Sequence, residues 1–195
     1  LARALLMADR IAVLIGGRIA QIGPRDEVLR SPASPDIARL VGMTNLAAGR
    51  VAQQSDGLAR IELESGRIVE CTSELAAGEP VWIGIRPEHL KLDVGRGDGR
   101  PIGSARVEAM FDDGLSTVVE LAVDGGTFTT HLLSGRGLAR RLQPGDLVDL
   151  VVAPDQVHAA PIASASADAA SQAETADGAA PPRSLQRNQA AGKPA

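Results

Sequence analysis

GEPVWIGIRPE, residues 78–88, is a strand pattern that returns later in the chain as GDLVDLVVAPD, residues 145–155. A glycine and an acid begin both stretches, aliphatic residues alternate through them, and a proline and an acid end them. The proline ends pairing with a neighbouring strand because it has no N–H group to donate. Residues 61–63 and 119–121 echo one another upstream. This internal similarity predicts a duplicated five-stranded unit.

Short alternating apolar runs separated by glycine turns fill the chain from residue 46 to residue 160. The predicted strands are 46–53, 58–63, 67–71, 81–85 and 89–92 in the first half, and 104–111, 117–123, 127–133, 147–152 and 156–159 in the second. We expect a connector at 93–101 and a short helix at 137–142. Many short strands of this kind are typical of a small barrel or sandwich. We therefore predict a mainly β fold whose related halves are about 46–93 and 101–160.

The alternation within the repeated strands predicts which side chains face a shared interior, because strand residues point to opposite faces with a period of two. The core-facing set takes three residues from each strand, Val81, Ile83, Ile85, Val148, Leu150 and Val152. We expect the other set, Trp82, Gly84, Asp149 and Val151, to point away from that interior. An aspartate at position 82 should then cost much less stability than one at position 83.

The stretch before residue 46 has a different pattern, a two-stranded ribbon followed by two short helices. Gly16 and Gly17 separate two apolar runs, where a tight turn needs positive φ. Gly23 ends the ribbon, and Pro24 suits the first position of a helix because its φ is fixed. Pro32 ends that helix.

The second helix has its own start and stop residues. Ser34 is placed to cap it, Pro35 to begin it and Gly42 to end it in a left-handed turn. Its predicted apolar face contains Ile37, Leu40 and Val41. Helices this short need a larger body to pack on. Since the body they were made to pack on is missing, we expect residues 8–42 to be mobile or partly unfolded.

Several of these motifs resemble a known family. ADRIAVL, GRIAQIG, RDEVLRSPAS, IARLVG and TNL, all within residues 8–46, resemble the end of the nucleotide-binding domain of ABC importer ATPases of the maltose, polyamine and oxyanion type. GIRPEHL, residues 84–90, resembles the signature of the TOBE domain that follows it. The resemblance implies an α/β remnant of the ATPase domain at 1–45 and a duplicated OB-like TOBE domain at 46–160. From residue 161 onward the composition predicts a disordered tail.

The resemblance also implies a function for the intact protein. The chain would be the C-terminal regulatory and dimerisation part of a bacterial ATP-binding subunit that couples ATP hydrolysis to solute uptake. Its expected partners are a second subunit, membrane permease subunits that contact the ATPase domain, and a small-molecule or protein regulator. The subunit would be cytoplasmic and peripheral to the inner membrane. Leu1 is not a methionine, and the family's switch histidine would precede Ala4, so we interpret the chain as a fragment.

The ATPase motifs themselves are missing from the sequence. It contains no GxxxxGK[ST] phosphate loop and no Leu-Ser-Gly-Gly-Gln signature; Leu133-Ser134-Gly135-Arg136 is a chance echo. We therefore expect no enzymatic activity, ATP binding or cofactor on this chain, whereas the intact parent would use ATP and Mg²⁺. Calorimetry with ATP on the purified chain would test this expectation.

Composition excludes further classes. A net charge of −4 with three aromatic residues, Trp82, Phe111 and Phe128, argues against a nucleic-acid surface. No apolar run reaches the length of a membrane span, no signal peptide is visible, and a soluble intracellular protein is expected. The single cysteine, Cys71, fits a reducing compartment, and an inert thiol is its expected state.

Few residues suggest a site. The three histidines, His89, His131 and His158, are not spaced as metal ligands, so we predict no metal site. Asp112 and Asp113 precede a glycine and favour a turn over paired catalytic carboxylates. Arg86 either ties down a turn, by holding Glu88 or a carbonyl, or contacts a ligand or partner.

The alternative function is a free-standing protein that binds or senses a small ligand, an oxyanion such as molybdate or tungstate. Oxyanion-binding relatives use backbone N–H groups, serines and a lysine near the last strand. The matching stretch here is 153–158; it has Asp155 where a hydroxyl is wanted and no lysine, and a carboxylate repels an anion. The remaining candidate ligand-binding residues are Ser104, Ser134, Arg136 and Arg86.

Overall fold

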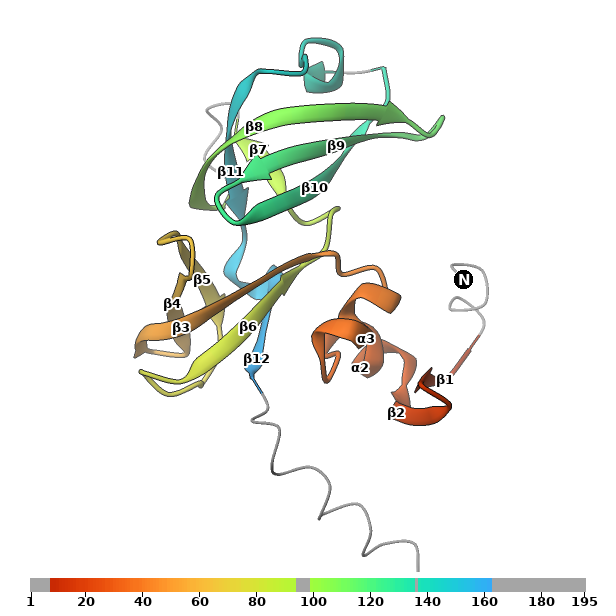
Figure 1. The fold of residues 1–195 in the computed structure, drawn as a ribbon, viewed down its shortest axis with the longest axis vertical. Helices are drawn as coiled ribbons and strands as arrows, with labels where there is room; N and C mark the ends of the chain where they lie inside the picture. Colours follow the sequence, from red (N-terminus) through yellow and green to blue (C-terminus); the bar gives the residue numbers. More distant parts are fainter. Residues whose placement is uncertain (1–7, 94–98, 136, 163–195) are drawn as a thin grey trace, which may run out of the picture. The chain divides into compact units, whose positions relative to one another are not determined.

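The computed structural model describes residues 8–93, 99–135 and 137–162 (Figure 1). Of the predicted tail, 161–195, residues 163–195 lie outside these residues, as does Arg136, whereas Pro161 is the last residue of a strand. Ten strands of the described chain form two antiparallel five-stranded sheets. The first sheet has the order β12 (Val157–Pro161), β6 (Pro80–Ile85), β3 (Asn45–Ser55), β4 (Leu58–Leu63), β5 (Ile68–Thr72). The second has the order β7 (Lys91–Asp93), β11 (Leu147–Val152), β8 (Arg100–Asp112), β9 (Ser116–Val123), β10 (Gly126–Leu133).

The two sheets confirm the duplication. Strands β3 to β6 occupy the positions in the first sheet that β8 to β11 occupy in the second. The repeated stretches at 78–88 and 145–155 contain β6 and β11, which lie second from the edge in their sheets. The edge strands β5 and β12 of the first sheet also contact each other, as the curl of an OB-like barrel requires. The predicted mainly β, OB-like fold is therefore correct.

The halves exchange their last strands. β7 belongs to the first half of the chain but pairs with β11 in the second sheet, and β12 belongs to the second half but pairs with β6 in the first. Each sheet is thus completed by the other half of the chain. In Figure 1 the chain crosses from one sheet to the other after β6 and again after β11.

Three local predictions need correction. β8 begins at Arg100, inside the predicted connector, and β7 begins at Lys91 because residues 86–90 form a turn closed by the His89 and Leu90 N–H groups on the Arg86 carbonyl. The predicted helix at 137–142 is a short 3₁₀ helix, Gly137–Arg140. A second 3₁₀ turn, Pro154–Gln156, precedes β12.

The predicted interior is confirmed. Val81, Ile83 and Ile85 are fully buried in one core with Leu150 and Val152, and Val148 packs against that core half-buried. Side chains from both sheets fill it, including Val51, Ile61, Val107, Val119 and Leu121.

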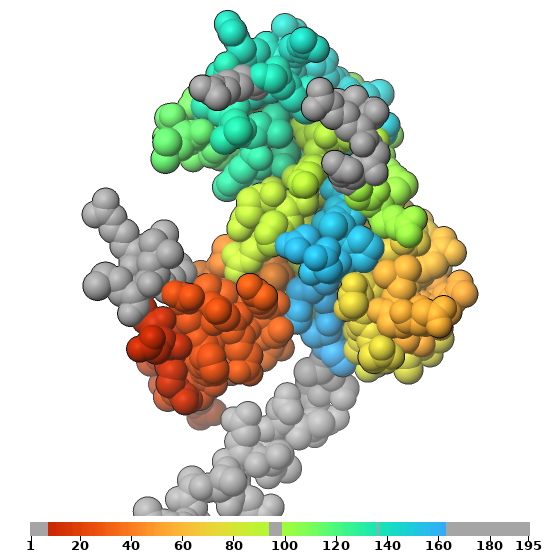
Figure 2. Space-filling model, turned by 180° about the vertical axis from the view of Figure 1, so that it is seen from behind, coloured from red at the N-terminus to blue at the C-terminus, as the bar shows by residue number. Residues whose placement is uncertain are grey.

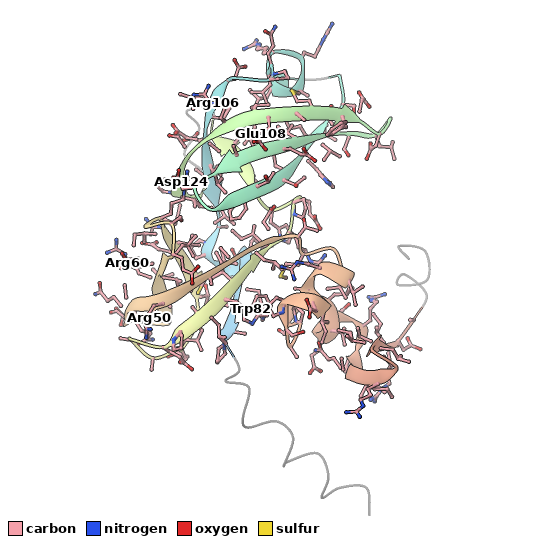
Figure 3. The ribbon with its side chains drawn as sticks, viewed as in Figure 1. Arg50, Arg60, Trp82, Arg106, Glu108 and Asp124 are labelled. Carbon is pink, nitrogen blue, oxygen red and sulfur yellow. The ribbon has the colours of Figure 1, made fainter. Side chains whose placement is uncertain are left out.

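Trp82 and Gly84 face away from that interior, as predicted, but this opposite face of β6 is covered and not exposed to solvent. Trp82 is 5% exposed and packs with Ala38 and Met43 in a separate apolar cluster. Figure 3 shows its side chain extending from β6 toward the helices of the N-terminal segment. A Cβ atom at Gly84 would clash with the Met43 sulfur, so the glycine makes room for this packing.

The N-terminal ribbon and helices form as predicted, as β1 (Arg10–Ile15), β2 (Arg18–Pro24), α2 (Arg25–Arg30) and α3 (Pro35–Leu40). The Ser34 hydroxyl accepts a hydrogen bond of 3.3 Å from the Ile37 N–H, and Gly42 has φ +87°. Pro24, however, precedes α2 with ψ 142° instead of occupying its first turn. Leu40, which we predicted on the apolar face of α3, is 50% exposed, and Ala38 is buried instead.

Candidate functional site

The N-terminal segment, residues 9–43, docks on the first sheet at a junction built from β6, β12 and the turn after β6. We call this contact the junction. Arg86 is its central polar group: its side chain is 17% exposed. Its Nη1 donates to the Val41 carbonyl at 2.9 Å and its Nη2 to the Leu29 carbonyl at 2.6 Å. The docking also corrects the expectation that the helices lack a body to pack on.

The Leu29 and Val41 carbonyls explain why position 86 is an arginine. Leu29 and Val41 lie at the C-terminal ends of α2 and α3, where backbone carbonyls lack helical N–H partners. A cation also interacts favourably with the partial negative charge of a helix C-terminus. Glu88, at 4.0 Å from Nη1, is the weaker neighbour. Arg86 therefore holds neighbouring carbonyls, the structural alternative that we weighed from the sequence.

His158 is the second polar group of the junction. Its ring lies edge-on to Trp82, with the ring centroids 4.9 Å apart. Burial lowers the pKa of His158, and a hydrogen bond to the Pro32 carbonyl opposes this shift. The His158 Nε2 atom is buried and has no hydrogen-bond partner among the residues that the structure describes.

A cavity of about 450 Å³ opens at the junction. Figure 2 shows the three parts of the chain that line it, orange, yellow-green and blue, meeting on one face of the molecule. Arg30, Ser31 and Met43 contribute from the N-terminal segment. The sheet side contributes Arg86, His89 and the stretch 155–158. Asp155, the residue that stands where a hydroxyl was wanted, therefore lines the same cavity as Arg86.

The structure does not bring Ser104 and Ser134 together with Arg86. The Ser104 hydroxyl donates to Asp149 at 2.6 Å across β8 and β11. The Ser134 hydroxyl donates to Asp112 at 3.0 Å at the end of β10. Neither serine lines the cavity beside Arg86.

The acidic pair and the cysteine behave as turn and core residues. Asp113 accepts hydrogen bonds from the Ser116 N–H, the Ser116 hydroxyl and the Leu115 N–H, and these bonds lower the pKa of its carboxyl group. Burial raises the pKa of the Cys71 thiol to about 11, which disfavours the reactive thiolate. Within the described ranges, no three His, Cys, Asp or Glu residues are grouped so that they could hold a metal ion.

Two residues that we did not single out from the sequence connect the halves. Asn45, 1% exposed, donates from Nδ2 to the Thr129 carbonyl at 2.8 Å and accepts from the Thr129 N–H at 2.6 Å. Its amide thus pairs with the edge of β10 as a neighbouring strand would. The sequence signal for this role was the position of Asn45, a polar residue at the start of an apolar strand.

Arg67 is the other connecting residue. From the turn before β5 its Nη2 donates to the Ser104 carbonyl at 2.6 Å and lies 3.1 Å from Asp124, which Figure 3 labels near the β9–β10 turn. A Cβ atom at Gly103 would lie 2.9 Å from Arg67 Nη1, so the glycine leaves room for the guanidinium group. Arg67 borders a second cavity of about 220 Å³.

Comparison with known proteins identifies the domain. A TOBE domain model matches residues 83–159. The spermidine/putrescine import ATP-binding protein PotA 1 of Pseudomonas aeruginosa is 35% identical over 155 residues, which cover 78% of this chain and 41% of that protein. PotA of Mesorhizobium japonicum is 31% identical over 157 residues, with 78% and 42% covered. The chain thus spans about two fifths of the length of these relatives.

A solved structure agrees with the fold. The cytoplasmic molybdate-binding protein ModG, with molybdate bound, superposes with a TM-score of 0.53 at 18% identity, over 61% of this chain and 96% of the ModG chain. In the part of our chain that the structure describes, no helix is long and apolar enough to cross a membrane. Taken together, the repeated OB-like sheets, the matched TOBE domain and the PotA relatives identify the chain as a C-terminal, TOBE-containing part of an ABC importer ATP-binding subunit.

Proposed function

We propose that the chain is the regulatory and dimerisation part of an importer subunit that couples ATP hydrolysis to solute uptake in the intact protein. In that protein, ATP and Mg²⁺ are bound by the ATPase domain, which also contacts the membrane permease subunits at the cytoplasmic side of the inner membrane. The regulatory part associates with its copy in a second subunit. The names of the relatives, import ATP-binding proteins, support this proposal.

The observation that carries the proposal is an apolar surface on the N-terminal segment. Large apolar side chains of β1, β2 and α3 point away from the junction and are strongly exposed: Leu14 61%, Ile19 58%, Ile22 57% and Leu40 50%. The buried side of the same segment packs on itself through Val13, Val28, Ile37 and Val41. An exposed apolar face of this kind marks an interaction surface. We propose that the ATPase domain covers it.

A chimera tests this function. We would replace the matching C-terminal part of Pseudomonas aeruginosa PotA 1 with this chain and measure solute uptake and ATP hydrolysis in the assembled importer. The expected result is uptake above the level of the truncated PotA 1. Serine at both Ile19 and Ile22 should reduce that uptake by about tenfold or more, since each buried side chain contributes about 1.5–3 kcal/mol to packing.

The matched control is Leu115→Ser, because Leu115 is 86% exposed on the β8–β9 hairpin, outside the ribbon. This variant should take up solute as the unmodified chimera does. A chimera no more active than truncated PotA 1, or equal loss in the ribbon and hairpin variants, would contradict the proposal.

The second candidate function is oxyanion binding, which the fold shared with ModG favours. It would use Ser104, Ser134, Arg136 and Arg86 as ligand-binding residues. Titration of the chain with molybdate in a calorimeter separates the two functions. We expect no saturable heat, because the two serine hydroxyls already donate to Asp149 and Asp112, and the carboxylate of Asp155 lines the same cavity as Arg86. Saturable binding that Ser104→Ala weakens would favour the second function.

A further inference from the structure

His158 lies between the first sheet and the N-terminal segment. Its imidazole is clamped between the Trp82 ring and the Pro32 carbonyl, so that it contacts both the sheet and the docked segment. Since the nitrogen that bonds the carbonyl must carry a hydrogen, Nε2 is the unprotonated atom of the neutral ring. That atom is buried, and no group in the described part of the chain forms a hydrogen bond with it.

Among the described residues, no acceptor is bonded to the His158 Nε2 atom, where an added proton would sit. Arg30 at the end of α2, and Arg86 and His89 after β6, line the same cavity and are basic. Asp155, in the turn before β12, is the one carboxylate in that lining; it is exposed and accepts a hydrogen bond from the Gln156 amide at 3.1 Å. Glu88 lies nearby on Arg86 and is about half exposed. A charged imidazole would therefore have an unpaired N–H at a buried atom, in a cavity lined by two arginines, which is costly.

We propose that His158 is a proton-operated release for the N-terminal segment: a proton taken from solvent by Nε2 loosens residues 9–43 from the first sheet. The remaining polar contacts of the junction, from Arg86 to the Leu29 and Val41 carbonyls, do not change charge in this step. The release belongs to this chain itself and holds whether or not the chain works in an importer.

The direction of the pH effect follows from linkage. Burial lowers the pKa of His158 in the docked state below its ordinary value of 6.5. When the segment is released, the imidazole meets solvent and regains that ordinary value, so the released state binds more protons in the interval between the two values. Docking is therefore at full strength above pH 6.5 and weakens as the pH falls through 6.5 toward the lowered value. Once the pH is below the lowered pKa of His158, docking weakens no further.

Trp82 reports the release directly. It is the one tryptophan of the chain and is 5% exposed when the segment is docked. In a fluorescence titration of the full chain from pH 8 to about pH 5, we expect the emission maximum to shift to the red while the circular dichroism of the sheets stays constant. His158→Phe, which keeps an aromatic edge on Trp82, and His158→Gln should both lose this shift.

His89→Gln is the matched control, because His89 lines the same cavity, whereas the described ring contact with Trp82 is made by His158. It should keep the shift. The proposal is overturned if the chain shows no shift, if both His158 variants retain it, or if His89→Gln removes it. It is equally overturned if the sheet signal changes together with the emission, since acid would then unfold the sheets and not release the segment.

Discussion

Replacing Asn45 with alanine is expected to lower the free energy of unfolding by about 3 kcal/mol, measured by urea denaturation. The side chain is 1% exposed and makes two hydrogen bonds with the backbone of Thr129. Without the amide, the N–H and C=O groups of Thr129 lose their partners at the edge of β10, and each unpaired buried group costs about 1–3 kcal/mol. One side chain would thus account for much of the connection between β3 and the second sheet.

Two further variants make the Asn45 result specific. Asn45→Asp keeps an acceptor for the Thr129 N–H but places a carboxylate against the Thr129 carbonyl, so it should destabilise the fold at least as much at neutral pH. Gln54→Ala removes an exposed amide that bonds Glu74 at 3.1 Å and should change stability by less than about 0.5 kcal/mol. Equal effects at Asn45 and Gln54 would show that the amide pairing with β10 contributes nothing.

Local patterns predicted most of the strands because alternation and glycine turns act over a few residues. Two strands, β4 at 58–63 and β11 at 147–152, have the predicted bounds. The same patterns did not predict which strands pair with one another. Residues 91–93 alternate in the same way whether they complete the first sheet or the second, so the exchange of β7 and β12 is visible only in three dimensions.

The junction was missed for a related reason. The sequence showed that Trp82 faces away from Ile83, which is correct, but not that Met43 and Ala38 cover it. Apolar residues at the end of one segment and on the outer face of a distant strand carry no mark that they meet. Arg86 was singled out as a cation beside a turn, yet its partners, the Leu29 and Val41 carbonyls, are backbone atoms with no sequence signal. Backbone partners of this kind emerge only from packing.

Ile83→Asp is expected to prevent stable folding, because Ile83 is fully buried in the core shared by both sheets. An unpaired carboxylate in that core costs several kcal/mol, on the order of the whole stability of a small domain. The cost exceeds that of the missing side chain alone, about 2–5 kcal/mol for Ile83→Ala. Circular dichroism should show loss of the sheet signal at neutral pH, with recovery when acid protonates the aspartate.

Trp82→Asp should act on a smaller part of the molecule, although Trp82 is buried too. Its neighbours, Ala38 and Met43, belong to the N-terminal segment, so the carboxylate escapes burial if the segment leaves the sheet. We therefore expect fast amide exchange in α3 while β6 and β11 stay protected, whereas Ile83→Asp exposes all three elements. The contacts that release would break are those of this cluster, of Arg86 and of His158. If Trp82→Asp removes protection from β11 as well, the two faces of β6 belong to one cooperative unit and the segment is not a separable part of the fold.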